Sequence, residues 1–491
     1  MSTLARTYRE SLALLTDLYQ LTMAYGYWKA GKQRQEAAFH LFFRTLPFEG
    51  GYAVACGIEP AIEFLQQFRF RDDDLAYLAE VPGADGRPLF DAGFLAHLRE
   101  LHLACDVDMV PEGTAVFPQE PLVRVRGPIV HAQLLETALL NLVNFQTLIA
   151  TKAARVAQAA RGEPVVEFGL RRAQGIDGGL AASRAAYVGG CAGTSNLLAG
   201  KLYGIPVRGT HAHSWVMSFA TERAAFQAYA EALPNNCVFL VDTYDTLEGV
   251  RHAIEVGRWL REHGYPLLGI RLDSGDLAYL SIEARKLLDA AGFTETPIMA
   301  SNDLDEHLIA SLKQQGATIA SWGVGTRLAT AYDQPALGGV YKLTAVRQPG
   351  GEWEPRVKLS EQAVKVTTPG ILQVRRYRSG GEFVGDMIYD ERFPPTGDPL
   401  IVDPLDPTRR KRFGTDTEHE ELLVPVFRGG RCVYTPPPLE EVRQRVQRQL
   451  AQFHAGVKRF VNPHRYPVGL EQGLHQRKTE LVLQARGVAT T

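Results

Sequence analysis

Short apolar runs alternate with amphipathic segments between residues 164 and 343, and this pattern constrains the fold more than any other feature of the chain. The runs read PVVEFG, GIPVRGT, CVFLVDT, LLGIRLDSGD, PIMASND, TIASWGVGT and GGVYKL. Helical patterns lie between several of them, at residues 221–233, 246–263, 278–291 and 303–315. Strands that alternate with helices at this spacing form βα units and a parallel sheet. About seven such units favour an irregular TIM-like α/β barrel over an open sheet.

The sequence on either side of this region has a different texture. Before it, AAFHLFF, GYAVACG and TAVFPQEPLVRVRGPIV predict strands of a partly exposed sheet, and residues 12–28 predict a helix. HAQLLETALLNLVNFQTLIATKAARVAQAA has apolar residues at helical spacing and predicts one long, largely buried helix. After about residue 342, segments rich in Gly, Pro and charge predict small sheets, and PPPLEEVRQRVQRQLAQFHAGVKRF predicts a late helix.

These patterns divide the chain into three expected parts. They are an N-terminal α+β domain at residues 1–135 that parts of 345–435 complete, an α/β barrel at 136–344, and a C-terminal segment with a helical tail at 345–491.

The composition of the chain is that of a soluble globular protein, with 45% hydrophobic and 22% charged residues. Its 53 basic and 55 acidic residues leave a net charge of −2, which argues against a nucleic-acid or membrane-surface partner. The five cysteines are scattered, without a C-x-x-C pair, and are expected to be reduced thiols. The sequence contains neither the apolar core of a signal peptide near its start nor a run approaching the ~20 apolar residues of a membrane span. We therefore expect a cytoplasmic protein.

Polar side chains follow the apolar runs at the point where each predicted strand ends. They are Glu167, Arg171, Thr210, His213, Asp242, Thr243, Arg271, Asp273, Ser301 and Asn302. In a barrel the carboxyl ends of the strands converge on one face, and this face carries the active site. The convergence predicts an enzyme.

Three of these strand ends have residues suited to anions, and each also has a purely structural interpretation. In GIRLDSGDL, Gly275 permits a tight turn before a helix whose N-terminus suits an anion, but Asp276 is equally suited to cap that helix. Arg271 and Asp273 form either part of a site or a buried salt bridge. In SWGVGT, Gly323 and Gly325 follow a late strand, where loops often bind phosphate or simply turn.

EFGLRRAQG offers Phe168 with two adjacent arginines, Arg171 and Arg172. Adjacent arginines are usually solvated. At the mouth of a barrel, however, guanidinium groups suit phosphate or carboxylate oxygens, which they bind through two parallel hydrogen bonds.

The segment GTHAHSW leaves three interpretations open for His211 and His213. A metal site needs three or more protein ligands, and the other strand ends supply no further clear histidine. One histidine packed and one exposed is the structural interpretation. The third is a nucleophile or base oriented by a carboxylate such as Asp242.

An ordered set of longer motifs resembles the nicotinate phosphoribosyltransferases, within the type II phosphoribosyltransferases. The motifs run from near residue 14 to about 470 and read LLTDLYQLTMAYGY, VEFGLRRAQGIDG, GGCAGTSN, GTHAHSWVMSF, VDTYDT, RLDSGDL, SNDLDE, GVGT, GGVYKL and NPHRYPVGL. The resemblance implies that nicotinate and phosphoribosyl pyrophosphate give nicotinate mononucleotide and pyrophosphate, with Mg²⁺ and coupled ATP hydrolysis, in NAD biosynthesis.

The resemblance also implies roles for single residues. Phe168 and Tyr19 resemble the aromatic plates that hold the pyridine ring. The family's tyrosine comes from a neighbouring subunit, which implies a homodimer with shared sites. The implied cations for the nicotinate and phosphoribosyl groups are Arg171, Arg172 and Arg271. The further implied substrate-binding residues are Gly323 and Gly325 at the ribose 5′-phosphate, and Thr210, Ser214 and Thr367. Mg²⁺ is expected to be held through the substrate phosphates, with Asp273, close to the ribose, as the candidate protein ligand.

His213 matches the family histidine that ATP phosphorylates, and Asp242 is expected to hold its imidazole in one tautomer. Nicotinamide-using relatives carry an aspartate where CAGTSN has Ser195, so serine favours the acid substrate by removing a like charge. The alternatives are a nicotinamide or quinolinate phosphoribosyltransferase and a metal-dependent barrel hydrolase with His211 and His213 as ligands.

Overall fold

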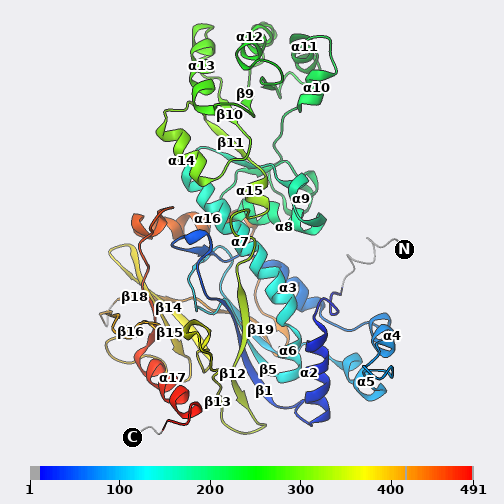
Figure 1. Ribbon diagram of the computed structural model, residues 1–491, viewed down its shortest axis with the longest axis vertical. Coiled ribbons are helices and arrows are strands. Elements are labelled where there is room, and N and C mark those ends of the chain that lie inside the picture. Colours follow the sequence, from blue (N-terminus) through cyan, green and yellow to red (C-terminus); the bar gives the residue numbers. More distant parts are fainter. Residues whose placement is uncertain (1–10, 415–416, 489–491) are drawn as a thin grey trace. The chain divides into compact units, whose positions relative to one another are not determined.

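The computed structural model describes residues 11–414 and 417–488, which divide into two compact units. Unit 1 comprises the described residues of Met1–Thr147 and Leu337–Thr491, and unit 2 is Leu148–Ala336 (Figure 1). The sequence predicts three parts, whereas the structure groups the C-terminal segment with the N-terminal domain. Among the described residues, the structure has no helix that is both long and apolar enough to cross a membrane.

Unit 1 is built around a seven-stranded sheet in the order β13-β12-β1-β5-β3-β19-β20. Each pair of neighbours in this sheet is antiparallel. The strands are β1 Glu36–Phe43, β3 Asp106–Met109, β5 Val123–Pro128, β12 Gly339–Arg347, β13 Glu354–Pro355, β19 Val424–Arg428 and β20 Arg431–Cys432. Segments from the end of the chain therefore complete the N-terminal sheet.

The first part of the chain also contributes helices to unit 1. They are α2 Leu18–Lys29, α3 Ile58–Gln67, α4 Asp72–Glu80, α5 Ala92–Glu100 and α6 Ile129–Leu134. Helix α6 packs on β1 and β5, and α2 packs on α6. The sequence predicts one helix over 131–160, but the chain breaks at Leu135, after which α7 runs over Glu136–Ala160. Two short strands, β2 Ala53–Val54 and β4 Ala115–Val116, form a separate pair.

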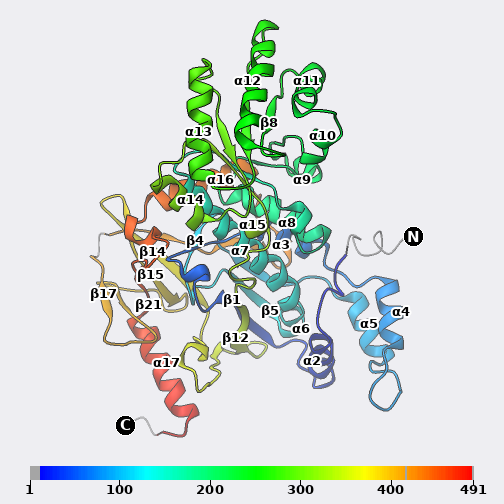
Figure 2. The same cartoon turned by 45° about the horizontal axis from the view of Figure 1, so that its top comes forward.

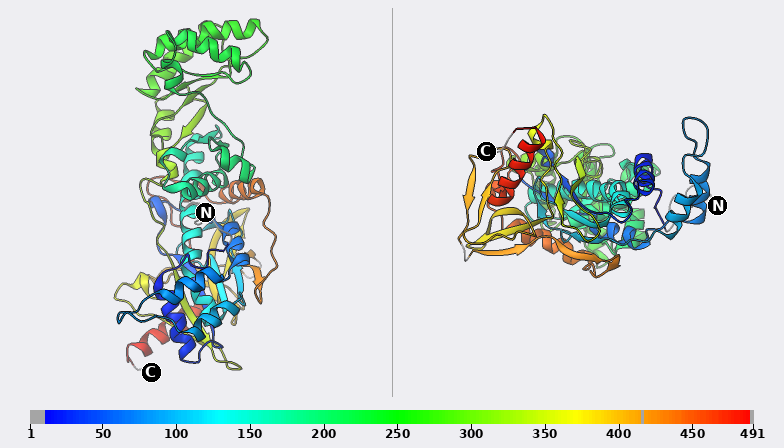
Figure 3. Two further views of the ribbon diagram at one scale, coloured as in Figure 1. Left: turned by 90° about the vertical axis from the view of Figure 1, so that its right-hand side faces the viewer. Right: turned by 90° about the horizontal axis from the view of Figure 1, so that it is seen from below.

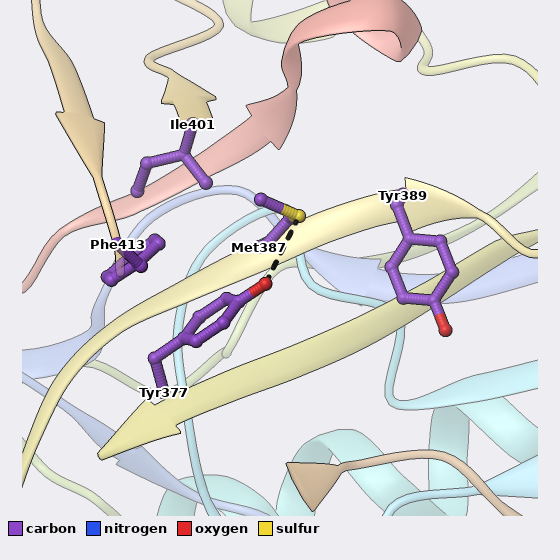
Figure 4. Packing of buried hydrophobic residues seen from close by; sticks show 5 residues of the cluster. All are labelled: Tyr377, Met387, Tyr389, Ile401 and Phe413. Carbon is purple, nitrogen blue, oxygen red and sulfur yellow. Dashed lines mark hydrogen bonds between the residues drawn. The ribbon is translucent and has the colours of Figure 1, made fainter. Parts of the chain in front are cut away.

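A second sheet of unit 1 has six strands in the order β17-β16-β21-β15-β14-β18. They are β14 Leu372–Ser379, β15 Glu382–Asp390, β16 Leu400–Val402, β17 Arg410–Arg412, β18 Glu418–Glu421 and β21 Val468–Glu471. Tyr377, Met387, Tyr389, Ile401 and Phe413 form an apolar cluster on this sheet (Figure 4). Helix α17, Gln472–Ala485, packs on β16 and β21 (Figure 3), and α16 spans Leu439–Ala451.

Unit 2 contains the predicted βα units. Its parallel sheet has the order β7-β6-β11-β10-β9-β8. The strands are β6 Val165–Glu167, β7 Gly193–Thr194, β8 Val238–Leu240, β9 Gly269–Leu272, β10 Ile298–Ala300 and β11 Ser321–Val324. The helices after α7 are α8 Gly175–Val188, α9 Leu197–Tyr203, α10 His213–Met217, α11 Glu222–Ala232, α12 Thr246–Glu262, α13 Leu277–Ala290, α14 Glu306–Gln314 and α15 Thr326–Ala329. Helices α11, α12 and α13 lie next to one another in chain order (Figure 2).

Aspartates fix the starts of three of these helices. Asp245, Asp276 and Asp305 each accept a hydrogen bond from the backbone N–H three residues later, at 2.9, 3.0 and 2.8 Å. A capping carboxylate satisfies a helix N–H that has no partner within the helix. The structural interpretation of Asp276, as the cap of α13, is therefore confirmed.

The α/β class is confirmed, but a closed TIM-like barrel is not, because the hydrogen-bonded ladder of the described strands is open between β7 and β8. Two of the predicted strands are not strands of this sheet. GGVYKL belongs to β12 in the antiparallel sheet of unit 1, and GIPVRGT forms only an isolated bridge between Val207 and Thr194. Pro206 has no backbone N–H to donate to a ladder, which explains why this run is irregular. Strand β7 was not predicted, because its two residues are too few to form a pattern in the sequence.

Candidate active site

The carboxyl ends of the parallel strands bring the predicted polar residues of unit 2 together around Arg271. Its guanidinium donates to Ser301 Oγ at 2.9 Å, to Thr210 Oγ1 at 2.6 Å and to Asp273 Oδ1 at 3.3 Å. Ser301 Oγ also donates to the Asp273 carboxylate. Arg271 therefore does more than form one salt bridge, since its planar guanidinium joins groups that follow β9 and β10 to Thr210, which follows an irregular run.

Phe168 forms a wall beside this cluster. The guanidinium carbon of Arg271 lies 5.9 Å from the centre of the Phe168 ring. Phe168 follows β6, and its N–H donates to Val324 O at 2.8 Å. A Cβ atom at Gly323 would lie 2.6 Å from this ring, so glycine is required there to make room for the aromatic side chain. The space taken by the Phe168 ring therefore explains the glycine at position 323, whereas the predicted contact with phosphate stays a prediction. A Cβ atom at Gly325, which precedes α15, would make only ordinary contacts.

His213 is the first residue of α10 and its side chain is 40% exposed. Its Nδ1 lies 3.2 Å from Thr243 Oγ1, and its Nε2 lies 3.7 Å from Asp273 Oδ2. Thr243 is one of the polar residues at the predicted strand ends, and the sequence alone does not assign it a role. The imidazole thus lies between a hydroxyl and a carboxylate, with solvent access.

The expected direct contact between Asp242 and His213 is wrong. Asp242 Oδ2 instead accepts from Asp273 N at 2.8 Å and from Ser274 Oγ at 2.6 Å. The physical reason is that the turn after β9 offers an N–H and a hydroxyl that need an acceptor, and the Asp242 carboxylate supplies it. Asp242 therefore supports Asp273, and Asp273 is the carboxylate that lies against the imidazole.

His211, unlike His213, has a structural role. It is 7% exposed, and its ring packs against Phe226, Tyr229 and Phe239. Its Nε2 accepts from Leu240 N at 3.2 Å, so this nitrogen replaces the acceptor that a neighbouring strand would give β8. His211 is therefore unavailable as a metal ligand. No group of three or more His, Cys, Asp or Glu side chains in the described ranges is arranged to hold a metal ion.

Burial lowers the pKa of His211 from its ordinary value of 6.5 to about 4. Between these two values the unfolded chain binds a proton at this site and the folded chain does not. We therefore expect the free energy of unfolding to fall as the pH drops from 6.5 towards 4, by up to roughly 3 kcal/mol from this group. Urea unfolding of the wild type and of His211→Phe at pH 7 and pH 5, followed by circular dichroism, measures the difference. Equal losses in the two proteins would contradict it.

Of the remaining predicted residues, four belong to unit 2 and two to unit 1. Arg171 and Arg172 are exposed in the 3₁₀ turn Leu170–Arg172, Ser195 is partly buried after β7, and Ser214 is exposed on α10. Tyr19, 47% exposed on α2, and Thr367, which is buried and accepts from Lys358 N at 2.8 Å, belong to unit 1. Their roles at the site stay predictions.

Family models of nicotinate phosphoribosyltransferase (NAPRTase) match the chain in three consecutive parts. The N-terminal domain matches residues 14–144, the NAPRTase family model matches 164–354, and the C-terminal domain matches 373–478.

Whole-chain relatives agree with these matches. Nicotinate phosphoribosyltransferase of Bacillus subtilis (strain 168) is 45% identical over 484 residues, covering 97% of this chain and 96% of the relative. The Homo sapiens protein of the same name is 39% identical, covering 94% and 95%.

Solved structures share the fold. The crystal structure of human nicotinic acid phosphoribosyltransferase superposes with a TM-score of 0.82 at 36% identity, over 95% of this chain and 99% of that chain. Nicotinate-nucleotide pyrophosphorylase from Pyrococcus furiosus, 22% identical with a TM-score of 0.69 over 90% and 95%, shares the fold. Together with the strand-end cluster around Arg271, these matches show that the chain belongs to the nicotinate phosphoribosyltransferase family.

Proposed function

We propose that this chain forms nicotinate mononucleotide and pyrophosphate from nicotinate and phosphoribosyl pyrophosphate. One observation carries the proposal: Arg271, Asp273, Thr210 and Phe168 converge at the strand ends of unit 2 in a chain that matches the family along its length. In this reaction the anomeric carbon loses pyrophosphate while the pyridine nitrogen bonds to it. The site must therefore position the ring and neutralise a leaving polyanion.

The residues of the cluster suit these tasks. The guanidinium group of Arg271 donates hydrogen bonds to oxygen atoms, as binding of an anionic substrate requires. The Phe168 ring beside it offers an apolar surface for the pyridine ring. The carboxylate of Asp273 is suited to stabilise positive charge that develops on the ribose. Comparing nicotinate, nicotinamide and quinolinate side by side as substrates, with chromatography of the mononucleotide products, tests this proposal. A product from nicotinamide or quinolinate alone would replace it with one of the sister activities.

Mg²⁺ fits the carboxylates at the end of β8 and β9. Asp242 Oδ1 is buried and has no hydrogen-bond partner among the described residues, and Asp273, in the turn after β9, donates its backbone N–H to Asp242 Oδ2. Sites for Mg²⁺ in phosphoryl chemistry typically combine one or two carboxylates with substrate phosphates. When bound, Mg²⁺ would neutralise charge on the pyrophosphate group.

We further propose that ATP phosphorylates His213. The Thr243 hydroxyl lies 3.2 Å from Nδ1, and when it accepts a hydrogen bond from Nδ1–H, the lone pair is left on Nε2. Nε2 then attacks the γ-phosphorus, the bond to the β,γ-bridging oxygen breaks, and ADP leaves. Water later hydrolyses the phosphohistidine and returns the free imidazole with inorganic phosphate.

We also infer that the open sheet of unit 2 is an irregular barrel closed by residues 205–211. On the β7 side, Thr194 N donates to Pro206 O at 3.0 Å and Arg208 N donates to Thr194 O at 2.9 Å. On the β8 side, Leu240 N donates to the His211 side chain. These three hydrogen bonds support a closure that needs no regular strand.

We propose that the protein works in the cytoplasm, which its five free cysteines support.

Ser195→Asp is expected to lower kcat/KM for nicotinate by roughly 30-fold, because a carboxylate beside nicotinate's own carboxylate costs about 2 kcal/mol. Asparagine has nearly the shape of aspartate but no charge, so Ser195→Asn is expected to retain most of the nicotinate activity. Steady-state kinetics of both variants with nicotinate and nicotinamide measure the effect. An unchanged kcat/KM for nicotinate in Ser195→Asp would remove Ser195 from the determinants of substrate choice.

We propose that the active form is a homodimer and that α9 lies in its interface. Leu197, Leu198 and Leu202 on α9 are 75%, 47% and 56% exposed, and Val207 is 42% exposed. Apolar side chains gathered on one surface mark an interaction site. A second copy is the expected occupant, since the family resemblance implies a tyrosine from a neighbouring subunit.

Leu202→Glu is expected to shift the protein from dimer to monomer, because it places a charge in an apolar interface. Leu308→Glu on α14, where leucine is 37% exposed, serves as the matched control and is expected to stay dimeric. Sedimentation velocity at several protein concentrations distinguishes the two. A monomeric wild type, or a Leu202→Glu variant that is as dimeric as the control, would refute the α9 interface.

A further inference from the structure

We propose that Glu167 is a positioning residue that fixes two substrate-facing segments of the site with a single buried carboxylate. The inference rests on the proposed function, because it concerns how that site selects its base. The two segments are the turn that carries Arg171 and Arg172, and the segment Thr194–Asn196 that contains Ser195. Glu167 ends β6 and is 1% exposed, so its carboxylate is held among protein groups.

One oxygen of this carboxylate holds the arginine turn. Glu167 Oε1 accepts from the backbone N–H of Gly169. The carbonyl of Gly169 then accepts from Arg172 N at 2.8 Å and from Ala173 N at 3.1 Å, which closes the turn. A displacement of Gly169 therefore moves both arginines. Gly169 has no freedom on its other side, since a Cβ atom there would lie 2.3 Å from Ala329 Cβ.

The other oxygen holds the segment that contains Ser195. Glu167 Oε2 accepts from Thr194 Oγ1 at 2.6 Å and from Ser183 Oγ at 2.9 Å. Thr194 Oγ1 in turn accepts from Asn196 N at 3.0 Å, and Ser195 N donates to the Glu167 carbonyl at 3.0 Å. Ser195 is thus flanked by two residues tied to Glu167, and its own N–H is bonded to Glu167.

The Glu167 carboxylate determines which group donates and which accepts in each hydrogen bond of this network. An ionised carboxylate only accepts hydrogen bonds, so the Thr194 hydroxyl must donate to it and keeps a lone pair for Asn196 N–H. Glutamine has the same shape, but its amide nitrogen would donate towards the two hydroxyls. The hydroxyl hydrogen of Thr194 would then lose its buried acceptor, and the segment would have to rearrange.

The consequence is that base selection depends on Glu167, although the residue is buried beneath the site. The arginine turn and Ser195 can face the same nicotinate carboxylate only if their separation is fixed, and Glu167 is the group bonded to both. A shift of about 1 Å in a positioning group can cost on the order of 100-fold in rate. A loss of general stability, by contrast, would lower the amount of active enzyme and leave the ratio between two bases unchanged.

The test compares Glu167→Gln and Thr194→Val with the matched control Glu222→Gln. Glu222 is a buried glutamate on α11 whose carboxylate bonds to His252 at 2.9 Å, outside the proposed site. Both site variants are expected to raise KM for nicotinate and to lower the nicotinate-to-nicotinamide ratio of kcat/KM by about 10- to 100-fold. The control is expected to keep the wild-type ratio. The double variant Glu167→Gln/Thr194→Val is expected to lower this ratio by less than the two single effects combined, because both changes act on one hydrogen bond.

Each outcome decides the proposal. A wild-type protein that converts neither base would refute the proposed function itself, which is a different result from failure of this inference. An active wild type whose base ratio is unchanged in Glu167→Gln would overturn the positioning role. If Glu167→Gln does not fold, Thr194→Val decides alone, since it keeps the charge and removes only one hydroxyl. A ratio that falls equally in Glu222→Gln would also overturn the role.

Discussion

Arg271→Ala is expected to lower kcat/KM for phosphoribosyl pyrophosphate by about 100- to 1,000-fold, the range seen when one preorganised donor to developing charge is removed. The guanidinium lies at the carboxyl ends of β9 and β10, and its hydrogen bonds to Thr210, Ser301 and Asp273 hold it in place before substrate arrives. Its removal costs a fixed positive charge and also leaves the Asp273 carboxylate with one donor fewer. Such a preorganised cation contributes mainly to the transition state, so we expect kcat to fall along with kcat/KM.

Two further variants separate this effect from a general loss of charge. Arg271→Lys keeps the charge but not the planar fork, and we expect it to recover only a small part of the activity. Arg251→Ala removes an arginine that pairs with Glu248 at 2.5 Å on the surface of α12 and is expected to leave the kinetics unchanged. Steady-state kinetics of the three variants, with thermal unfolding as a check on folding, would settle the point. An Arg271→Ala enzyme within threefold of the wild type would contradict the assignment.

His213→Ala is expected to abolish labelling of the protein by γ-labelled ATP and to remove the effect of ATP on turnover. The coupling free energy between two ligands is typically 1–3 kcal/mol, so ATP should change the apparent KM of the wild type by about 5- to 150-fold. In the variant this factor should fall to one, while slow ATP-independent formation of product remains, because Arg271 and Phe168 are untouched.

The neighbours of His213 give this prediction its controls. Thr243→Val removes the hydroxyl at Nδ1 and is expected to slow phosphorylation without abolishing it. His263→Ala, which removes a histidine at the C-terminal end of α12, is expected to label like the wild type. Normal labelling of His213→Ala would place the phosphate acceptor elsewhere in the chain.

Local patterns in the sequence predicted the helices and strand ends of unit 2 well. Thr246–Glu262 and Leu277–Ala290 lie within one residue of their predicted bounds, because apolar spacing and a capping aspartate are both local signals. The same holds for Arg271 and Asp273, which follow a short apolar run and meet at its end as expected. The motif resemblance, and not the spacing, supplied the roles of individual residues.

Features that depend on distant partners could not be predicted in this way. GGVYKL has the same local pattern as the parallel strands, yet it pairs with β1, whose residues lie about three hundred positions earlier in the chain. Likewise, no local signal shows whether Asp242 or Asp273 lies against His213, since that depends on which carboxylate the turn after β9 engages. Gly323 is explained by the ring of Phe168, a contact between two strands that the sequence does not display.

Incubation of the purified protein with Mg²⁺ and γ-labelled ATP, followed by nicotinate and phosphoribosyl pyrophosphate, tests the central claim most directly. The account predicts an acid-labile, base-stable label on the protein that is released as inorganic phosphate, and nicotinate mononucleotide formed in equal amount with pyrophosphate. Absence of nicotinate mononucleotide under these conditions would contradict it.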